Sequence, residues 1–190
     1  DSTDAHSALS DSIMTAKVLN IVKKKQPSTW ESFFKTANKS DTETIIKKGE
    51  IITLNEYYYG KSRLHLVAPL HQKYCMHPIY TGWYYAFDLR TDVEPLLNLS
   101  INELKVEMKK SPKFLRTIRS NKAPIIVDAQ YGMQAEPYNV MDKSLINKRA
   151  DIIKNNEKFS QNILHALREV AEEKEQSKTQ EDIYAEESIY

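Results

Sequence analysis

The sequence predicts an α+β protein in which N-terminal helices precede a small curled β-barrel with a helical insert, and C-terminal helices follow it. Apolar residues recur at a helical period of about 3.6 near both ends of the chain, in residues 11–25 and 143–173. Between them lie five short segments rich in β-branched and aromatic residues, which are typical of strands in a small barrel or sandwich. A length of 190 residues allows one domain with a substantial core and additional segments.

The first predicted helix carries an apolar stripe and ends before Pro27. Met14, Val18 and Ile21 follow Asp11 on the same face, which predicts a buried stripe. Asp11 is therefore expected to be a carboxylate on a mostly apolar face, where it needs a cation, a hydrogen-bond donor or a metal as its partner.

Two shorter helices are expected before the strands, over residues 28–34 and 41–48. Trp30, Phe33 and Phe34 have helical spacing and are predicted to belong to the core. The second of these helices is expected to stop at Gly49, a favoured residue at helix C-termini.

The strands are predicted from the change to extended, β-branched and aromatic composition after Glu50. A helical insert is expected over residues 101–110, because Ser100 and Glu103 have the spacing of a capping box. The expected strands cover residues 51–59, 63–67, 83–89, 114–118 and 125–127.

The C-terminal part is predicted to form helices over residues 143–155 and 158–173, followed by a poorly packed linker. Residues 169–190 contain eight acidic side chains and two lysines, whereas the whole chain has a net charge of +1. Such a composition buries too little apolar area to offset the entropy of ordering. The expected division is 1–26 (terminal helix of a first domain), 27–49 (helical connector), 50–171 (β-rich domain) and 172–190 (acidic linker).

The sequence gives no indication of a disulfide framework or a zinc site. Cys75 is the single cysteine, and the irregular spacing of His71, Cys75 and His77 favours a loop over a metal site. No apolar run approaches the length of a membrane span, so no membrane partner and a cytoplasmic location are expected.

The segment 47–122 is the expected nucleic-acid-binding region. It contains thirteen basic side chains against seven acidic ones, interleaved with tyrosines and tryptophans. Cations follow phosphates and aromatic faces stack on bases, although alternation in strands places about half of such aromatics in the core. The candidates are Lys61, Arg63, Trp83, Tyr57 and Tyr59.

Several short motifs in a fixed order resemble the bacterial exodeoxyribonuclease I family of DEDDh 3′→5′ exonucleases. They are Ala5-His6-Ser7-Ala8-Leu9-Ser10-Asp11, Ala16-Lys17, Lys25-Gln26-Pro27, Asn38-Lys39, Val67-Ala68-Pro69-Leu70, Asp88-Leu89, Pro95-Leu96-Leu97 with Leu99, and Asn121-Lys122 with Pro124. The resemblance covers residues 6–153 and implies that His6 is a general base and that Asp11 is a catalytic residue and a ligand of Mg²⁺, which prefers hard oxygen ligands. It also implies an SH3-like middle domain over the predicted strands.

The resemblance predicts a part of a larger enzyme. The family's site requires three further acidic residues from a domain that these 190 residues do not include, so the chain alone is expected to bind no Mg²⁺ and to lack nuclease activity. The complete enzyme is expected to be a monomer acting on single-stranded DNA in repair and recombination. Two alternatives stay open: a module that recruits single-strand-binding protein, and a structural brace. The basic surface expected for recruitment has no match near residues 128–134.

Overall fold

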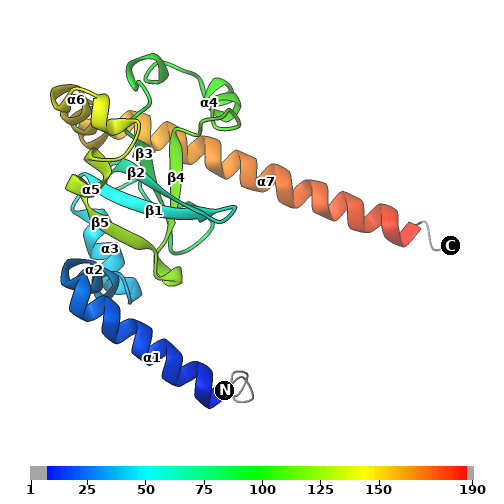
Figure 1. Ribbon diagram of the computed structural model, residues 1–190. Helices are drawn as coiled ribbons and strands as arrows, with labels where there is room; N and C mark the ends of the chain where they lie inside the picture. The colour runs from blue at the N-terminus through cyan, green and yellow to red at the C-terminus, as the bar shows by residue number, and fades with distance from the viewer. Residues whose placement is uncertain (1–7, 188–190) are drawn as a thin grey trace.

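The computed structural model describes the backbone of residues 8–187 and the side chains of residues 8–177. Three helices come first: α1 (Ala8–Lys25), α2 (Pro27–Lys35) and α3 (Lys39–Lys47) (Figure 1). The side chain of Asn38 caps α3 by accepting a hydrogen bond from the Asp41 N–H. None of the described helices is both long enough and apolar enough to cross a membrane.

A single antiparallel sheet of five strands forms the centre of the molecule. Its strands are β1 (Ile52–Tyr58), β2 (Lys61–Pro69), β3 (Trp83–Asp88), β4 (Leu115–Arg119) and β5 (Ile125–Asp128), in the order β4-β3-β2-β1-β5. The five strands lie where the composition predicts them, and the α+β class is confirmed. The sheet is open rather than a closed barrel, because β4 and β5 form its two edges.

The connection between the two edge strands forces the sheet to curl. Neighbouring strands lie about 4.8 Å apart, so the edges of a flat five-stranded sheet would be roughly 19 Å apart. Only residues 120–124 join β4 to β5, and three of them form the 3-10 turn η2 (Ser120–Lys122), with a rise of about 2 Å per residue. Ala123 then adopts a left-handed φ of 43°. A link this short requires the sheet to bring its edges toward one another.

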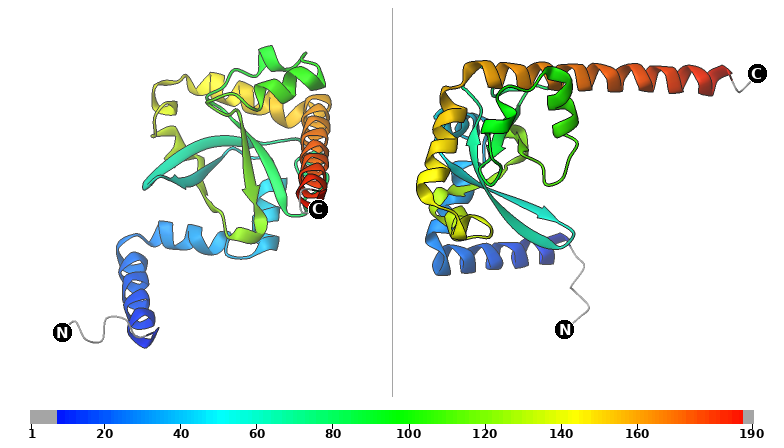
Figure 2. Two further views of the ribbon diagram at one scale, coloured as in Figure 1. Left: turned by 90° about the vertical axis from the view of Figure 1, so that its right-hand side faces the viewer. Right: turned by 90° about the horizontal axis from the view of Figure 1, so that it is seen from above.

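The remaining elements cover the sheet. The 3-10 turn η1 (Glu94–Leu96) and the helix α4 (Ile101–Glu107) form the insert between β3 and β4, and the predicted Ser100–Glu103 capping box is present. The helix α5 (Ala129–Met133), the turn η3 (Tyr138–Val140), α6 (Lys143–Asn155) and α7 (Glu157–Glu187) follow β5. Figure 2 shows that α7 crosses the body and then projects far beyond it.

The core lies between the sheet and these helices. Phe87 on β3 contacts Phe114 and Phe159, with ring centroids 5.6 Å and 6.3 Å apart. Other fully buried side chains come from both layers; they include Leu66, Leu70, Leu89, Leu104, Ile118, Ile146, Ile153 and Ile163.

Glu43 on α3 links the N-terminal helices to the sheet. It accepts a hydrogen bond from the Ser120 hydroxyl at 3.2 Å and another from Tyr84 on β3. Burial, reinforced by the negative charge of Glu43, raises the pKa of Tyr84 to about 12. Tyr84 therefore acts as a hydrogen-bond donor at all ordinary pH values, and α3 has a fixed position against β3 and η2.

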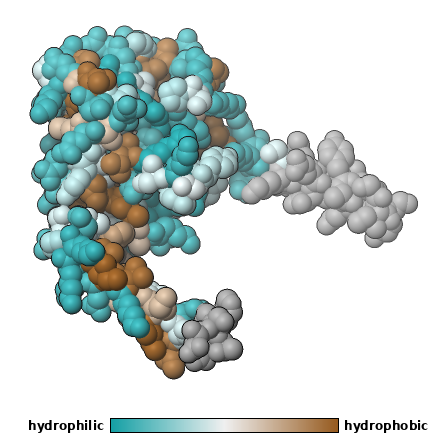
Figure 3. Space-filling model, viewed as in Figure 1, coloured by the Kyte–Doolittle hydropathy of each residue, from teal (hydrophilic) through white to brown (hydrophobic). Residues whose placement is uncertain are grey.

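The N-terminal helices differ from the sequence prediction in their burial. None of the described residues of α1 is buried, and the predicted stripe of Met14, Val18 and Ile21 is exposed. Phe33 and Phe34 on α2 are also exposed, so their assignment to the core is wrong. Figure 3 shows the hydrophobic surface that results along α1. The prediction of a buried stripe is therefore wrong for the described residues, because no described element covers α1.

The structure also differs from the prediction of a linker over residues 172–190, because α7 continues without interruption to Glu187. Residues 172–177 are exposed, so this part of the helix extends without packing on the sheet. At the start of α7 Glu157 pairs with Lys73 at 3.0 Å, and further along acidic side chains pair with the body where α7 passes α4. There Lys105 binds Glu169 at 3.1 Å and also binds Glu173.

Gly132 is expected to be essential for the packing of α5 on the sheet. Its N–H donates to Thr53 Oγ1 at 2.9 Å, and a Cβ there would lie 2.6 Å from that oxygen and 3.0 Å from Leu66 Cδ1. Gly132→Ala should therefore lower the free energy of unfolding by about 1–3 kcal/mol, as measured by urea denaturation. Thr53→Ala removes the closest atom, so the double variant should lose less than the sum of the two single variants. Additive losses would contradict this contact as the cause.

Candidate nucleic-acid interface

A cationic groove lies where the curled sheet brings β1 and β4 toward one another. Its volume is about 480 Å³, and it includes side chains from β1, β4 and the link after β4. Four cations face one carboxylate in this groove: Lys113, Arg116, Arg119 and Lys122 against Glu56. The groove therefore carries an excess of positive charge beside the apolar surfaces of Leu54, Leu115 and Pro124.

Arg116 differs from the other three cations because its charge is neutralised inside the fold. Its NH1 lies 2.9 Å from Glu56 Oε2, and its Nε and NH2 each lie 3.1 Å from Asp88 Oδ2. Among the described residues, Lys113, Arg119 and Lys122 have no carboxylate within ion-pair distance. These three side chains provide the groove with its uncompensated charge.

Arg119 also covers the predicted stacking residue Trp83. Its guanidinium carbon lies 4.2 Å from the centroid of the Trp83 ring, and the Tyr80 ring lies 5.0 Å from it. Trp83 is half-buried at the start of β3. One face of the indole is therefore occupied by a cation, which leaves less of the ring for a base than an exposed tryptophan would offer.

The other predicted residues lie on the hairpin that joins β1 to β2. In the antiparallel register Tyr58 is opposite Lys61 and Glu56 is opposite Arg63, so each pair shares a face of the sheet. Tyr58 lines the groove, and partial burial together with a hydrogen bond to Glu56 raises its pKa. Tyr57 and Tyr59 are exposed, as are Lys61 and Arg63.

Asp88 is the centre of a buried ion network beneath the groove. It is fully buried, and it accepts hydrogen bonds from the Tyr138 hydroxyl at 2.5 Å and from the backbone N–H of Arg90 at 3.2 Å. The Arg90 guanidinium lies 3.1 Å away, and His65 Nδ1 lies 3.3 Å away. His65 Nε2 in turn lies 3.3 Å from Glu56. The network therefore connects β1, β2, β3, β4 and η3.

The pKa of Asp88 results from opposing effects. Burial alone would raise it, but the hydrogen bonds from His65 and Tyr138 and the charges of Arg90 and Arg116 outweigh burial and hold the pKa below its ordinary value. Asp88 is therefore a structural carboxylate that stays ionised, rather than an acid or base for catalysis.

A second hollow, also of about 480 Å³, is lined by other members of the Asp88 network. It is lined by Arg63 and His65 on β2, by Arg90, and by residues 135–138. The buried Nε of Arg90 has no hydrogen-bond partner among the described residues. Glu136 is the carboxylate that faces these cations.

The catalytic candidates are not assembled in the described structure. His6 lies outside the described residues, and Asp11 is exposed near the N-terminal end of α1. No group of three or more His, Cys, Asp or Glu side chains within residues 8–177 is arranged to hold a metal. In the 71–82 loop, the ring nitrogen Nδ1 of His77 accepts hydrogen bonds from the N–H groups of Ile79 and Tyr80, each at 3.0 Å. His77 thus has a structural role.

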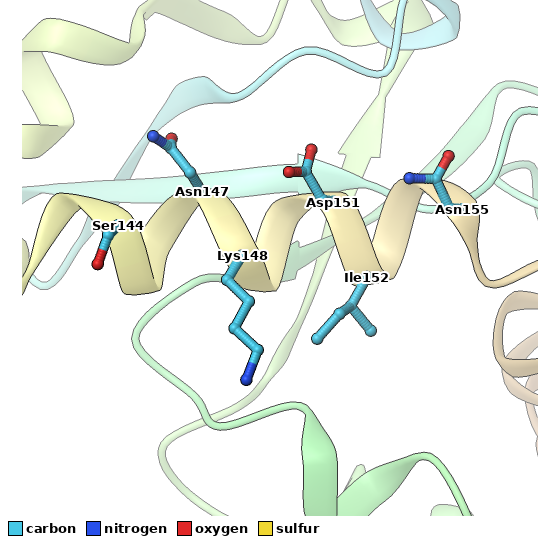
Figure 4. Close-up of a pocket in the computed structure, with 6 residues that line it drawn as sticks. All are labelled: Ser144, Asn147, Lys148, Asp151, Ile152 and Asn155. Carbon is cyan, nitrogen blue, oxygen red and sulfur yellow. The ribbon is translucent and has the colours of Figure 1, made fainter.

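The hollow of greatest volume among those described, about 660 Å³, does not form a convergent site. Figure 4 shows that its lining residues all project from α6, with Asn147, Asp151 and Asn155 on one side and Lys148 and Ile152 on the other. Lys148 is paired with Glu94 at 2.6 Å. Side chains that diverge from one helix do not surround a substrate.

The sequence prediction missed Tyr58, Lys113, Arg119 and Lys122 as individual groove residues. All four lie within the basic segment 47–122. That charge excess was the available signal, but their proximity depends on the curl of the sheet, which composition does not report.

The comparisons with known proteins agree with the motifs. No family model matches the chain. The chain is 28% identical over 175 residues to "Exodeoxyribonuclease I" of Buchnera aphidicola, covering 84% of this chain and 40% of that protein. The chain thus spans about 40% of the length of this relative.

Solved structures of exonuclease I share the fold. That of Methylocaldum szegediense has a TM-score of 0.66 at 21% identity, covering 85% of this chain and 37% of its own. The Escherichia coli enzyme in complex with a 5cy-dT13 oligonucleotide has a TM-score of 0.64 at 18% identity, with the same coverage. A complex described as ExoI/SSB-Ct has a TM-score of 0.64 at 19% identity, covering 86% of this chain and 37% of its own. The chain is therefore similar to part of exodeoxyribonuclease I, as its motifs indicate.

The Asp88 network should be a main source of stability and of acid sensitivity. Asp88→Asn leaves Arg90 and Arg116 without their buried anion, so we expect a loss of about 3–5 kcal/mol in the free energy of unfolding at neutral pH. Because the pKa of Asp88 is lowered by folding, its charge stabilises the fold above about pH 4, and this contribution is lost as the pH falls through the folded-state value.

Urea denaturation between pH 7 and acidic pH measures both effects. The matched control is Asp151→Asn, an exposed carboxylate on α6, which should change stability by less than about 0.5 kcal/mol. Equal effects of the two substitutions would refute the role of the network.

Proposed function

We propose that this chain is the strand-guiding portion of an exodeoxyribonuclease I, and that the groove between β1 and β4 holds single-stranded DNA. The observation that carries the proposal is the presence of three uncompensated cations, Lys113, Arg119 and Lys122, beside Tyr58 and apolar surface. Such a groove suits a phosphate backbone with unstacked bases and offers no pattern of donors that would select a sequence. The similarity to an enzyme described in complex with an oligonucleotide supports this substrate class.

The exposed cations of the hairpin extend the same surface. Lys61 and Arg63 are proposed to contact phosphates, and Tyr57 and Tyr59 to contact bases. Trp83 is proposed to contribute through the part of its ring that stays exposed, because Arg119 occupies one face. Together these residues would keep hold of a strand through many cuts, as an enzyme that digests processively requires.

We also propose that α1 belongs to the exonuclease domain and that residues 50–171 form the family's SH3-like domain. The exposed apolar stripe of α1 supports this assignment, because a stripe of this kind needs a cover. In the complete enzyme His6 would act as the general base and Asp11 as one ligand of Mg²⁺. A single exposed carboxylate does not hold this ion, so the described residues by themselves do not fit a magnesium site.

Recruitment of single-strand-binding protein is the second candidate function. The similarity to the ExoI/SSB-Ct complex suggests this partner, and the hollow beside Arg63 and Arg90 supplies cations for a carboxylate. An acidic peptide with a free C-terminus should then bind, and amidation of that C-terminus or Arg63→Ala should weaken it. An amidated peptide that binds equally well would remove this candidate. A brace without any ligand would bind neither DNA nor peptide.

Salt dependence tests the strand-binding groove. Binding of the chain to a strand of about 30 nucleotides should weaken as salt rises, with a slope of log K against log salt near −0.7 for each phosphate contact. Lys113→Ala and Lys122→Ala should each reduce the magnitude of this slope by about 0.7, without a change in base preference.

Lys143→Ala is the matched control, because this exposed lysine lies at the start of α6 and outside the groove. It should leave the slope unchanged. Absence of binding at low salt would disprove the proposal, and equal effects of all three substitutions would disprove the groove as the site.

A further inference from the structure

The turn between β1 and β2 has an unusual residue at its tip. Tyr59 has a φ of 51° and Gly60 a φ of 76°, so two successive residues occupy the left-handed region, as in a type I′ hairpin turn. Glycine, asparagine and aspartate are favoured at such positions, whereas a bulky side chain is strained there. The turn therefore places a tyrosine where the backbone disfavours it.

No packing within the described chain compensates for this strain. The side chain of Tyr59 is 99% exposed, and the neighbouring Tyr57 is 72% exposed. Tyr57, Tyr58 and Tyr59 follow one another into the tip of the β1–β2 hairpin, and Figures 1 and 2 show that this hairpin projects from the body. Residues held in such sparsely populated backbone regions are concentrated at active sites and ligand-binding sites.

The strained positions are adjacent to the cationic groove. Among the described residues, Tyr59 and Ala123 are the non-glycine residues with positive φ. Tyr59 directly follows Tyr58, and Ala123 lies between Lys122 and Pro124. Tyr58, Lys122 and Pro124 all line the groove. The backbone is thus strained on both sides of the same hollow.

We propose that Tyr59 stacks on an unpaired base of the strand held in the groove and so makes the site select single strands over duplexes. This inference rests on the proposed strand-binding function of the groove. Lys61 and the groove cations attract a polyanion, and an exposed phenol ring offers a flat face to a base without reading its edge. Bases in a duplex are already stacked on their neighbours, so they are not available to the tip.

The test is a thermodynamic cycle between residue 59 and a base. Tyr59→Gly removes the ring and suits the left-handed φ, so its thermal unfolding midpoint should be equal to or higher than that of the unaltered chain. Its affinity for a strand of about 30 nucleotides should be weaker by about 5-fold or more, with an unchanged salt slope. On a strand of the same length made of abasic sites, the two proteins should bind equally.

Duplex DNA and a conservative variant complete the experiment. Affinity for duplex should be the same with and without Tyr59, so the preference for single strands should fall by the same factor as the single-strand affinity. Tyr59→Trp keeps an aromatic face and should retain the preference for single strands. Tyr59→Leu lacks such a face and should behave like Tyr59→Gly.

The outcomes separate this inference from the function on which it rests. If Tyr59→Gly binds the normal strand as well as the unaltered chain does, while Lys113→Ala still weakens binding, the groove function stands and the stacking role is wrong. A lower affinity of Tyr59→Gly for the abasic strand would also overturn stacking. If the unaltered chain binds no strand at low salt, both proposals fail.

Discussion

The short connection between β4 and β5 is the constraint on which the rest of the structure depends. Residues 120–124 join the two opposite edges of a five-stranded sheet. The turn η2 and the left-handed Ala123 shorten the distance that these residues can span. The sheet must curl to satisfy this link, and the curl has two consequences. It encloses Asp88 at the end of β3, and it brings the side chains of β1 and β4 together as the walls of one groove.

The cations of the groove and of the Asp88 network fall into two groups. Arg90 and Arg116 are held by Asp88, and Arg116 is held by Glu56 as well, so their charges contribute to the fold. Lys113, Arg119 and Lys122 remain uncompensated at the surface, where their charges are available to a polyanion. A buried ion pair costs desolvation and adds stability only when its hydrogen bonds are complete, as they nearly are around Asp88. The network therefore fixes the walls of the groove without neutralising its surface.

Local sequence signals predicted the helices and strands, but they did not predict features that depend on contacts between distant parts of the chain. The β-branched and aromatic runs gave all five strands, and Ser100 with Glu103 gave the start of α4, because these signals act within a few residues. Phe33 and Phe34 were wrongly placed in the core, because spacing reveals an apolar face but not whether anything covers it. The helical state of residues 174–187 was missed. The polar composition correctly indicates that this segment lacks a core, but a helix can form without one because its backbone hydrogen bonds are made within the helix. The proximity of Lys113 and Lys122 depends on the curl, so no local pattern predicted it.

The two exposed apolar surfaces have different chemistry and extend toward the same side of the molecule. Figures 1 and 2 show that the N-terminal end of α1 and the tip of the β1–β2 hairpin lie on the same side of the body. The exposed stripe of Met14, Val18 and Ile21 on α1 is aliphatic, which suits packing against protein. The hairpin tip is aromatic and followed by Lys61, which suits bases and phosphates. Under the proposed assignment of α1 to the exonuclease domain, the part of that domain that covers α1 would lie on the side of the hairpin. The end of α1 that carries Asp11 lies on the same side of the body as the hairpin tip, so a cover on this end of α1 would be a neighbour of the aromatic tip.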